Sequence, residues 1–390
     1  MKKSIFVMGF TLLAAFSQAQ VQDDTYTNPI LTAVPSLGIN PDAVGGGMGD
    51  IGVSTKPGLS DQYWNSSKYA MSESPGGFAI SYTPWMRKIV GQIDLAQIAG
   101  FYKISDIAGT VSASLRYFSV GDVVMRQSAN DLGYTVSPHE FAFDAGYSRK
   151  LAENFSMGVN IRLISSDLSV KQDDYHPGFG VAADINGFLL QPIDIPSGES
   201  KLGFGFNISN IGTKISYDKG NTSNFLPTTL RLGLSYYIPF DQYNRLSISA
   251  ETYRLLVPSQ QSRYTTGFDK NDPSTWQMTS EQYSQIGVMK GIGMSFADAP
   301  NGFKEEMQEF NWALGAEYSY NEMFFVRAGY SNEAKIKGNR KYFTFGAGFK
   351  WTAFRIDVGY VVATAPQSPI DGILRFTLAF DADGLKDLAK

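Results

Sequence analysis

The feature that most constrains this chain is an alternation of apolar and polar side chains with a period of two, which dominates from residue 76 onward. In the segment 154–163, one side carries only apolar residues, namely Phe155, Met157, Val159 and Ile161. Successive residues of a β-strand point to opposite faces, whereas a helix cannot place alternate residues on one face. The sequence therefore predicts a β fold.

The alternating segments form fourteen candidate strands, and most have the roughly 9–11 residues that a tilted strand needs to cross a membrane. The second is the weakest, because Gln97 interrupts its apolar face. The predicted strands are 76–86, 93–103, 107–119, 139–149, 154–167, 178–190, 201–209, 227–238, 244–255, 309–319, 322–332, 340–350, 354–363 and 372–380.

The connections between these segments alternate in length. Those after even-numbered strands are mostly short, whereas those after odd-numbered strands are often long, as in 120–138, 168–177, 210–226 and 256–308. One exception is the proline-containing link Gln191–Ser200. Short periplasmic turns and long outer loops are typical of outer-membrane barrels. An even number of strands predicts that both chain ends are periplasmic.

A soluble β-sandwich would also alternate, and it is the alternative to a barrel. The composition favours the barrel, since 39 glycines and 14% aromatic residues suit a wall with an apolar outside and a polar inside. Aromatic residues also lie close to the predicted strand ends, as an interfacial girdle requires: Tyr147, Tyr236, Tyr237, Tyr318, Tyr320, Tyr330, Tyr342, Trp351 and Tyr360. The predicted fold class is an all-β transmembrane protein, a 14-stranded antiparallel outer-membrane β-barrel.

The N-terminus resembles a secretory signal peptide. Lys2 and Lys3 precede the apolar stretch Ile5–Phe16, and the small residues Ser17 and Ala19 follow it. This stretch is shorter than the roughly 20 residues of a membrane-spanning helix. Residues 1–19 are thus predicted to be removed, and an exported chain with no Cys forms no disulfides.

Residues 20–75 do not alternate and are predicted to form a plug or periplasmic segment before a barrel of 76–380 and a periplasmic tail of 381–390. The segment contains a glycine run that would allow close backbone contact with the barrel wall, namely Gly45, Gly46, Gly47 and Gly49. A phosphate-binding loop would need a preceding strand and a following Lys and Ser or Thr, which are absent.

Charges of both signs fall on the predicted inward face of the strands. They are Arg116, Arg162, Arg231, Arg327, Arg355 and Arg375 against Asp144, Asp184, Glu251, Glu317 and Asp357. Because unpaired charges in a narrow lumen are costly, we expect them to pair across strands. The same residues could instead line a selective pore.

Signatures of catalysis are missing. The chain has two histidines, and it contains no nucleophile elbow, zinc-binding helix motif or cysteine cluster. A net charge of −4 argues against a nucleic-acid partner. We therefore expect a protein that is not an enzyme and that has no cofactor and no catalytic or metal site.

Two motifs of the N-terminal segment carry a family resemblance. The stretch 39–53, which reads INPDAVGGGMGDIGV, is followed by Gln62-Tyr63-Trp64-Asn65, and both resemble the mature N-terminus of the PorV family of the type IX secretion system. The similarity continues through 81–85 to the end of the chain. Asn65-Ser66-Ser67 departs from the Asn-Pro-Ala that is frequent in the wider family.

The resemblance implies a barrel of the FadL fatty-acid transporter type with a role in protein secretion. Proteins of this family bind the C-terminal signal domain of secreted cargo as it leaves the translocon, Sov or SprA. They pass it to the attachment complex, where the sortase PorU removes the signal and joins the cargo to lipopolysaccharide. The expected partners are therefore these proteins together with outer-membrane lipid and lipopolysaccharide, and no nucleic acid.

The 256–308 loop is the expected partner-binding element, because loops longer than about 12–15 residues are usually functional or disordered. Its candidate contact residues are Tyr264, Phe268, Trp276, Tyr283, Met289 and Phe296. The alternative is that these side chains pack on one another over the barrel mouth.

Two further functions are consistent with the sequence. A FadL-like fold could transport hydrophobic small molecules passively, and an accessory role in lipopolysaccharide modification is the third possibility. Fold alone does not decide between them. A continuous apolar pocket with a lateral opening would favour transport, whereas a sealed and charged lumen would favour the secretion role.

Overall fold

The computed structural model describes residues 26–87, 91–125, 133–169, 174–195, 198–220, 222–365 and 368–384. The predicted signal peptide 1–19 and most of the predicted tail lie outside these ranges. Among the described residues, no helix is long and apolar enough to span a membrane.

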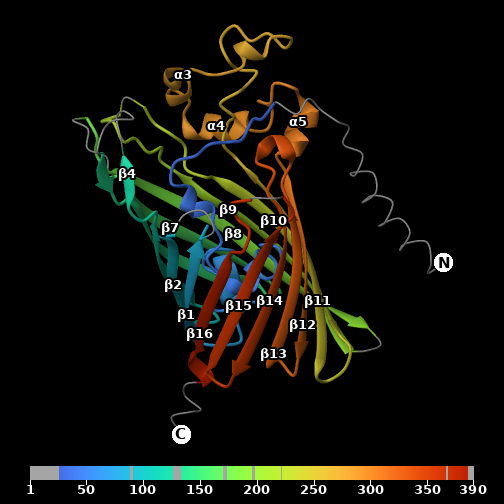
Figure 1. Ribbon diagram of the computed structural model, residues 1–390. Helices are drawn as coiled ribbons and strands as arrows, with labels where there is room; N and C mark the ends of the chain where they lie inside the picture. Colours follow the sequence, from blue (N-terminus) through green and yellow to red (C-terminus); the bar gives the residue numbers. More distant parts are fainter. Residues whose placement is uncertain are drawn as a thin grey trace, which may run out of the picture.

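Fourteen antiparallel strands close into a barrel, as predicted, with the first strand hydrogen-bonded to the last (Figure 1). The wall strands are β1 Gly76–Trp85, β2 Ile93–Ser105, β3 Gly109–Ser119, β6 His139–Ala152, β7 Phe155–Asp167, β8 Gly178–Ile195, β9 Gly198–Gly212, β10 Thr229–Pro239, β11 Asn244–Leu255, β12 Asn311–Tyr320, β13 Phe324–Asn332, β14 Lys341–Trp351, β15 Phe354–Ala363 and β16 Leu374–Asp381.

The alternation orients the wall as expected. In β6 the phenylalanines Phe141 and Phe143 are exposed on the outer surface, whereas Ala142 and Asp144 are buried inside. Closure leaves no strand edge, so the backbone of the wall is hydrogen-bonded without help from water. The outer surface can therefore be apolar and the interior polar.

One sequence prediction about the wall was wrong. Gln191–Ser200 is not a link, because β8 and β9 continue through it and stay paired as far as Ile195 and Gly198. The apolar face that Gln97 interrupts in β2 points inward, where Ile93 and Leu95 pack with Phe118. Inward apolar residues are tolerated there because the segment before the barrel covers them.

Outside the wall, β4 Val123–Met125 and β5 Tyr134–Val136 form a separate two-stranded sheet in the loop between β3 and β6. The remaining elements are short helices. Before the barrel lie η1 Pro35–Gly38, α2 Ala43–Gly46 and η2 Ser66–Met71, and in the long loops lie η3 Pro273–Thr275, α3 Ser280–Ser284, α4 Val288–Met294, α5 Phe303–Gln308 and η4 Lys335–Lys337.

The segment 26–75 runs through the barrel from one end to the other (Figure 1). It begins beside the long loops, where Asn28 donates its backbone N–H to the carbonyl of Ile336, and it enters β1 at the end with the short turns. Along the way α2 packs against β14, β15 and β16, and η2 packs against β6, β7 and β8.

The first described residue therefore lies at the end of the barrel opposite to the end of β16. We expected both chain ends on the side of the short turns. The even strand number fixes only the ends of β1 and β16, where Gly77 pairs with Asp381. One additional passage through the lumen places Tyr26 at the long-loop end.

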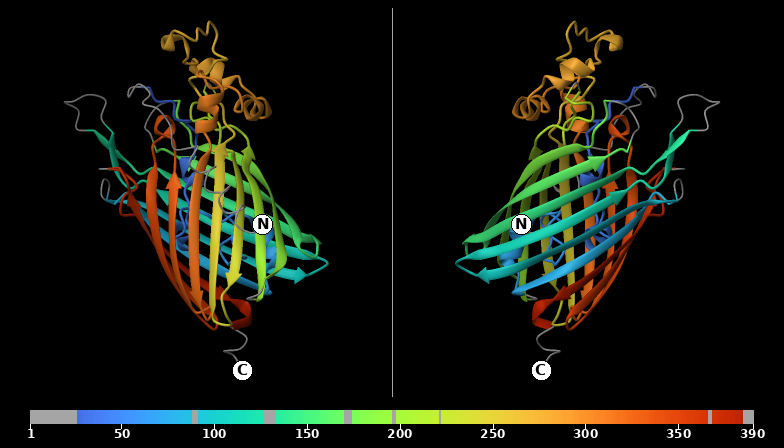
Figure 2. Two further views of the ribbon diagram at one scale, coloured as in Figure 1. Left: turned by 90° about the vertical axis from the view of Figure 1, so that its right-hand side faces the viewer. Right: turned by 90° about the vertical axis from the view of Figure 1, so that its left-hand side faces the viewer.

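The 256–308 loop forms a folded body, here called the cap, that stands above the barrel mouth (Figure 2). It connects β11 to β12 and contains η3, α3, α4 and α5.

Candidate functional site

The motif residues of the N-terminal segment build its local structure inside the barrel. The side chain of Asp42 accepts the backbone N–H groups of Val44 and Gly45 and so caps α2. The buried indole of Trp64 donates to the same carboxylate at 2.8 Å. One aspartate thus joins the glycine run to the second motif, 22 residues away in sequence.

Each glycine of the run lies in close contact with the barrel wall or with another part of the N-terminal segment. A Cβ atom at Gly45 would approach the Trp64 ring to 2.5 Å, and one at Gly46 would approach Arg375 to 2.7 Å. Gly47 lies against the backbone of β14, and Gly49 has a φ of +82° beside the backbone of Tyr330. Gly47 and Gly49 therefore let two backbones meet without side chains between them, whereas Gly45 and Gly46 leave room for the Trp64 ring and the Arg375 side chain.

The wall supplies matching glycines. A Cβ at Gly205 would lie 2.0 Å from the carbonyl oxygen of Val53, and one at Gly329 would lie 2.2 Å from the carbonyl carbon of Met48. The inward glycines thus make room for the N-terminal segment rather than for a water-filled channel.

Most of the charged residues that were predicted to face inward form ion pairs with one another. Arg162 contacts Asp144 at 2.5 Å and Asp184 at 2.9 Å. Across the lumen, Arg327 contacts Glu317 at 2.6 Å and Asp357 at 2.8 Å. Two further pairs are Arg231 with Glu251 at 3.0 Å and Arg355 with Asp357 at 2.7 Å.

Three of the predicted arginines contact the N-terminal segment, and one of them, Arg231, donates to the hydroxyl of Tyr63 at 3.3 Å. Arg116 donates to the carbonyl of Ser36 at 2.8 Å, and Arg375 contacts Asp50 at 3.2 Å. Sequence reasoning missed Asp50, because no periodicity marks a residue outside the strands. It also placed Tyr237 and Tyr342 in the aromatic girdle, yet their hydroxyls donate inward, to Ser54 O and to Asp50.

The space beside Arg116 and Arg162 is small. The cavity that Leu37, Tyr63 and Arg116 border has a volume of about 10 Å³. Pockets for small ligands usually measure about 300–1,000 Å³. This space therefore offers little room for a lipid or an aromatic hydrocarbon.

Above the barrel, the cap has an apolar core of its own. Val257, Met278, Tyr283 and Ile286 are buried together with Phe225 from the neighbouring loop. The hydroxyl of Tyr283 donates to Pro258 O at 3.0 Å, and the indole of Trp276 donates to Asp269 O at 2.8 Å. Two of the six residues expected to contact a partner thus stabilise the cap from within, since Trp276 and Tyr283 are buried.

The other expected contact residues are accessible. Met289 is 73% exposed, Phe296 and Tyr264 are each about half exposed, and Phe268 is partly buried. Tyr264 also lines an open groove of about 620 Å³, whose walls include Gln282, Ile286, Lys290, Gly293 and Met294. The groove therefore presents apolar and polar side chains beside the cationic Lys290.

Lys214, in the loop after β9, forms hydrogen bonds with the cap. Its ammonium donates to the carbonyls of Tyr283 and Ser284, each at 3.0 Å, and lies 4.4 Å from the centre of the Phe225 ring. Burial lowers the pKa of Lys214 to about 8.

Sequence reasoning also missed a group of acidic residues at the base of the cap. Asp298, Glu306 and Glu309 are buried, and burial together with the charge of Glu309 raises the pKa of Asp298 to about 8. Burial likewise raises the pKa of Glu309. The sequence signal for this group was the acidic stretch 305–309. Acidic residues in a loop are more commonly charges that face the solvent.

The comparisons with known proteins agree with this architecture. The family model described as type IX secretion system protein PorV matches residues 20–262. Among solved structures, the chain is similar to the Pseudomonas putida toluene transporter TodX, with 11% identity, a TM-score of 0.50, and coverage of 91% of this chain and 98% of that chain. A Pseudomonas aeruginosa FadL homologue matches with 12% identity, a TM-score of 0.46, and coverage of 91% and 99%. No curated protein sequence matches.

Proposed function

This chain belongs to the PorV family of outer-membrane proteins of the type IX secretion system, and on that premise we propose that it is a cargo shuttle. It binds the C-terminal signal domain of secreted cargo at the translocon, Sov or SprA. It then delivers the cargo to the attachment complex that contains the sortase PorU.

The observation that carries this proposal is a folded cap with exposed apolar side chains above a lumen that is already occupied. A partner that approaches from the loop end meets the cap first (Figure 2). Met289 and Phe296 lie on its surface, and Tyr264 lines its groove. Aromatic residues and methionines are enriched at protein interfaces, where they bury large areas.

Passive transport of hydrophobic molecules is the weaker alternative. It would require a conduit, whereas glycine-to-backbone contacts and ion pairs hold the N-terminal segment against the wall. The similarity to the toluene transporter concerns the fold, and one fold hosts many functions. The apolar outer wall would contact lipid and lipopolysaccharide in either case.

The test is to fill the groove and measure cargo capture. Gly293→Trp places a large ring at a position where a Cβ meets no atom within 4 Å, so the helix is not strained. We expect the variant to lose cargo with uncleaved C-terminal domains when it is purified from native membranes. Co-purified cargo is measured by quantitative mass spectrometry.

A matched control is Lys270→Trp, which adds the same ring to an exposed position of the cap outside the groove walls. Heat-modifiable migration in gels shows that both barrels have folded. If both variants recover as much cargo as the parent, the groove is not the binding site. Recovery of fatty acids in place of cargo would instead support transport.

A further inference from the structure

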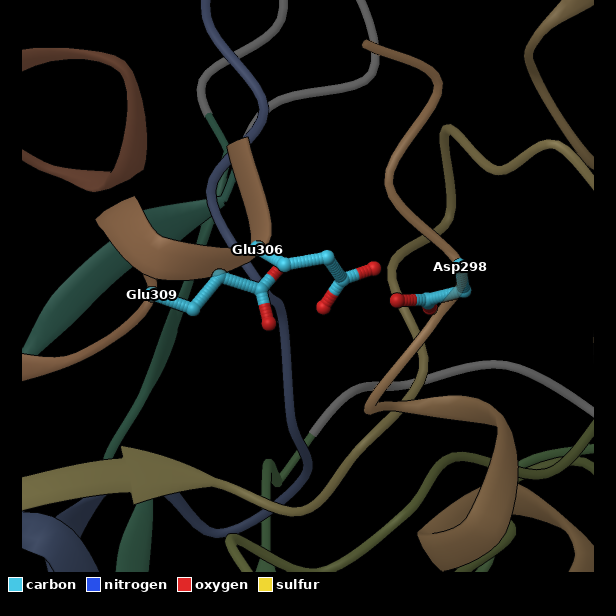
Figure 3. A group of neighbouring side chains, drawn as sticks. All are labelled: Asp298, Glu306 and Glu309. Carbon is cyan, nitrogen blue, oxygen red and sulfur yellow. The ribbon is translucent and has the colours of Figure 1, made fainter. Parts of the chain in front are cut away.

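The base of the cap contains three carboxylates that converge. Asp298 lies ahead of α5, Glu306 lies in α5, and Glu309 follows it. One oxygen of each lies within 4.8 Å of the others, and the side chains of Asp298 and Glu306 point toward one another (Figure 3). All three side chains are buried. We call this group the carboxylate triad.

The positive charges that contact the triad do not balance it. Arg254 contacts Glu309 at 2.7 Å and Glu306 at 3.4 Å. Lys337 contacts Glu309 at 2.9 Å and also Glu305, a fourth buried carboxylate, at 2.8 Å. Four carboxylates therefore share these two cations, and two negative charges remain when all four are ionised. Burying uncompensated charge is expensive, so a further positive species is expected in this group.

One oxygen of the triad also has no partner. Asp298 is fully buried, and its Oδ2 accepts the backbone N–H of Ser259 at 2.5 Å. Its Oδ1 has no hydrogen-bond donor among the described residues. A buried acceptor without a partner usually marks a missing water or ion. The charge count and the unpartnered oxygen thus point to the same place.

We propose that the carboxylate triad binds one calcium ion through Asp298, Glu306 and Glu309. Calcium prefers oxygen ligands at about 2.3–2.6 Å, so ligands on opposite sides of the ion are separated by roughly 5 Å. The spacing of the triad meets this limit. Magnesium binds at about 2.0–2.1 Å and releases its water reluctantly, so it fits this group less well. A divalent ion also matches the two uncompensated charges.

The position of this site gives the ion a structural role. Arg254 belongs to β11 and Lys337 to η4, whereas Asp298 and Glu306 belong to the cap and Glu309 directly follows it. Asn28 of the N-terminal segment donates to Glu305 at 2.9 Å. The calcium ion therefore stabilises a junction where the cap, the barrel rim and the N-terminal segment meet.

Calcium binding can be measured by titration calorimetry on the mature barrel, purified in detergent without lipopolysaccharide and freed of metal with a chelator. We expect heat with calcium chloride that saturates at one ion per chain. Magnesium chloride should bind more weakly by at least about tenfold, given its preference for rigid octahedral sites. Asp298→Asn should abolish the saturable heat.

The matched control is Glu281→Gln, which removes one negative charge from an exposed position of α3 in the same cap and should leave calcium binding unchanged. The Asp298→Asn variant keeps an oxygen that accepts from Ser259, so the cap should still fold. Folding is checked by the rate at which trypsin cleaves the cap, which calcium should slow in the parent but not in this variant.

Two results would overturn the site. The first is an absence of saturable calcium binding together with cap cleavage that does not respond to calcium, which would mean that protons neutralise the triad. The second is equal calcium affinity in the parent and in Asp298→Asn, which would place the ion elsewhere.

Discussion

Glu251, on the inner wall of the barrel, accepts the backbone N–H of Gly52, in the N-terminal segment, at 2.9 Å. The same oxygen accepts the N–H of Val53 at 3.0 Å, while the other oxygen contacts Arg231 at 3.0 Å. One buried carboxylate thus neutralises a wall arginine and anchors the segment that fills the lumen. The charges inside the barrel therefore stabilise the wall and its occupant together.

Replacing Glu251 with Gln should destabilise the protein strongly. Arg231 would remain buried without its counter-charge, and removing one partner of a buried ion pair costs about 3–5 kcal/mol. The urea concentration at the unfolding midpoint, measured in detergent micelles, reports this loss. Glu199→Gln is the control, because its exposed contact with Lys201 at 3.5 Å should contribute at most about 1 kcal/mol. Equal midpoints for both variants would contradict the anchoring role.

Gly205→Val should displace the N-terminal segment and open the lumen. A Cβ there would lie 2.0 Å from the carbonyl oxygen of Val53, a contact that neither backbone can accept without moving. Single-channel conductance in planar bilayers measures the opening. Ala183→Val adds similar bulk on the outer face of the wall, where Ala183 is exposed, and should leave the barrel closed. Closed barrels for both variants would show that the segment tolerates the added side chain.

Trp64→Phe should weaken the folding of the N-terminal segment. It removes the indole that donates to Asp42 at 2.8 Å inside the barrel. An unmet buried hydrogen bond costs about 1–3 kcal/mol, and the smaller ring leaves space as well. The unfolding midpoint in urea is again the measurement. Trp312→Phe, on the outer surface of the wall, should change it much less.

A single cysteine can test the direction of the N-terminal segment, because the natural chain has none. Thr27 is exposed beside the cap, so Thr27→Cys should react with a membrane-impermeant maleimide on intact cells. Glu153→Cys, in a short turn, should react only after the outer membrane is permeabilised. Labelling of Glu153→Cys but not of Thr27→Cys on intact cells would place the long loops on the periplasmic side.

The sequence by itself determined the wall of this protein. Each strand shows its two faces through the residue at every second position, so fourteen segments and their closure could be predicted, although β8 and β9 extend beyond their predicted ends. The inward arginines and acids were identified in the same way, because facing inward is a property of one strand. The motif around Gly45 and Trp64 also indicated a segment that approaches the wall closely.

Only the tertiary structure decided which of these groups meet. Arg375 contacts Asp50 across 325 residues of sequence, and Tyr26 lies beside Glu305 at the cap. No local pattern separates Trp276, inside the cap, from Met289 on its surface. The physical reason is the distance along the sequence between the residues that interact. Strand periodicity is set by neighbouring residues, whereas the path of the N-terminal segment and the charge balance of the cap arise from contacts between distant parts of the chain.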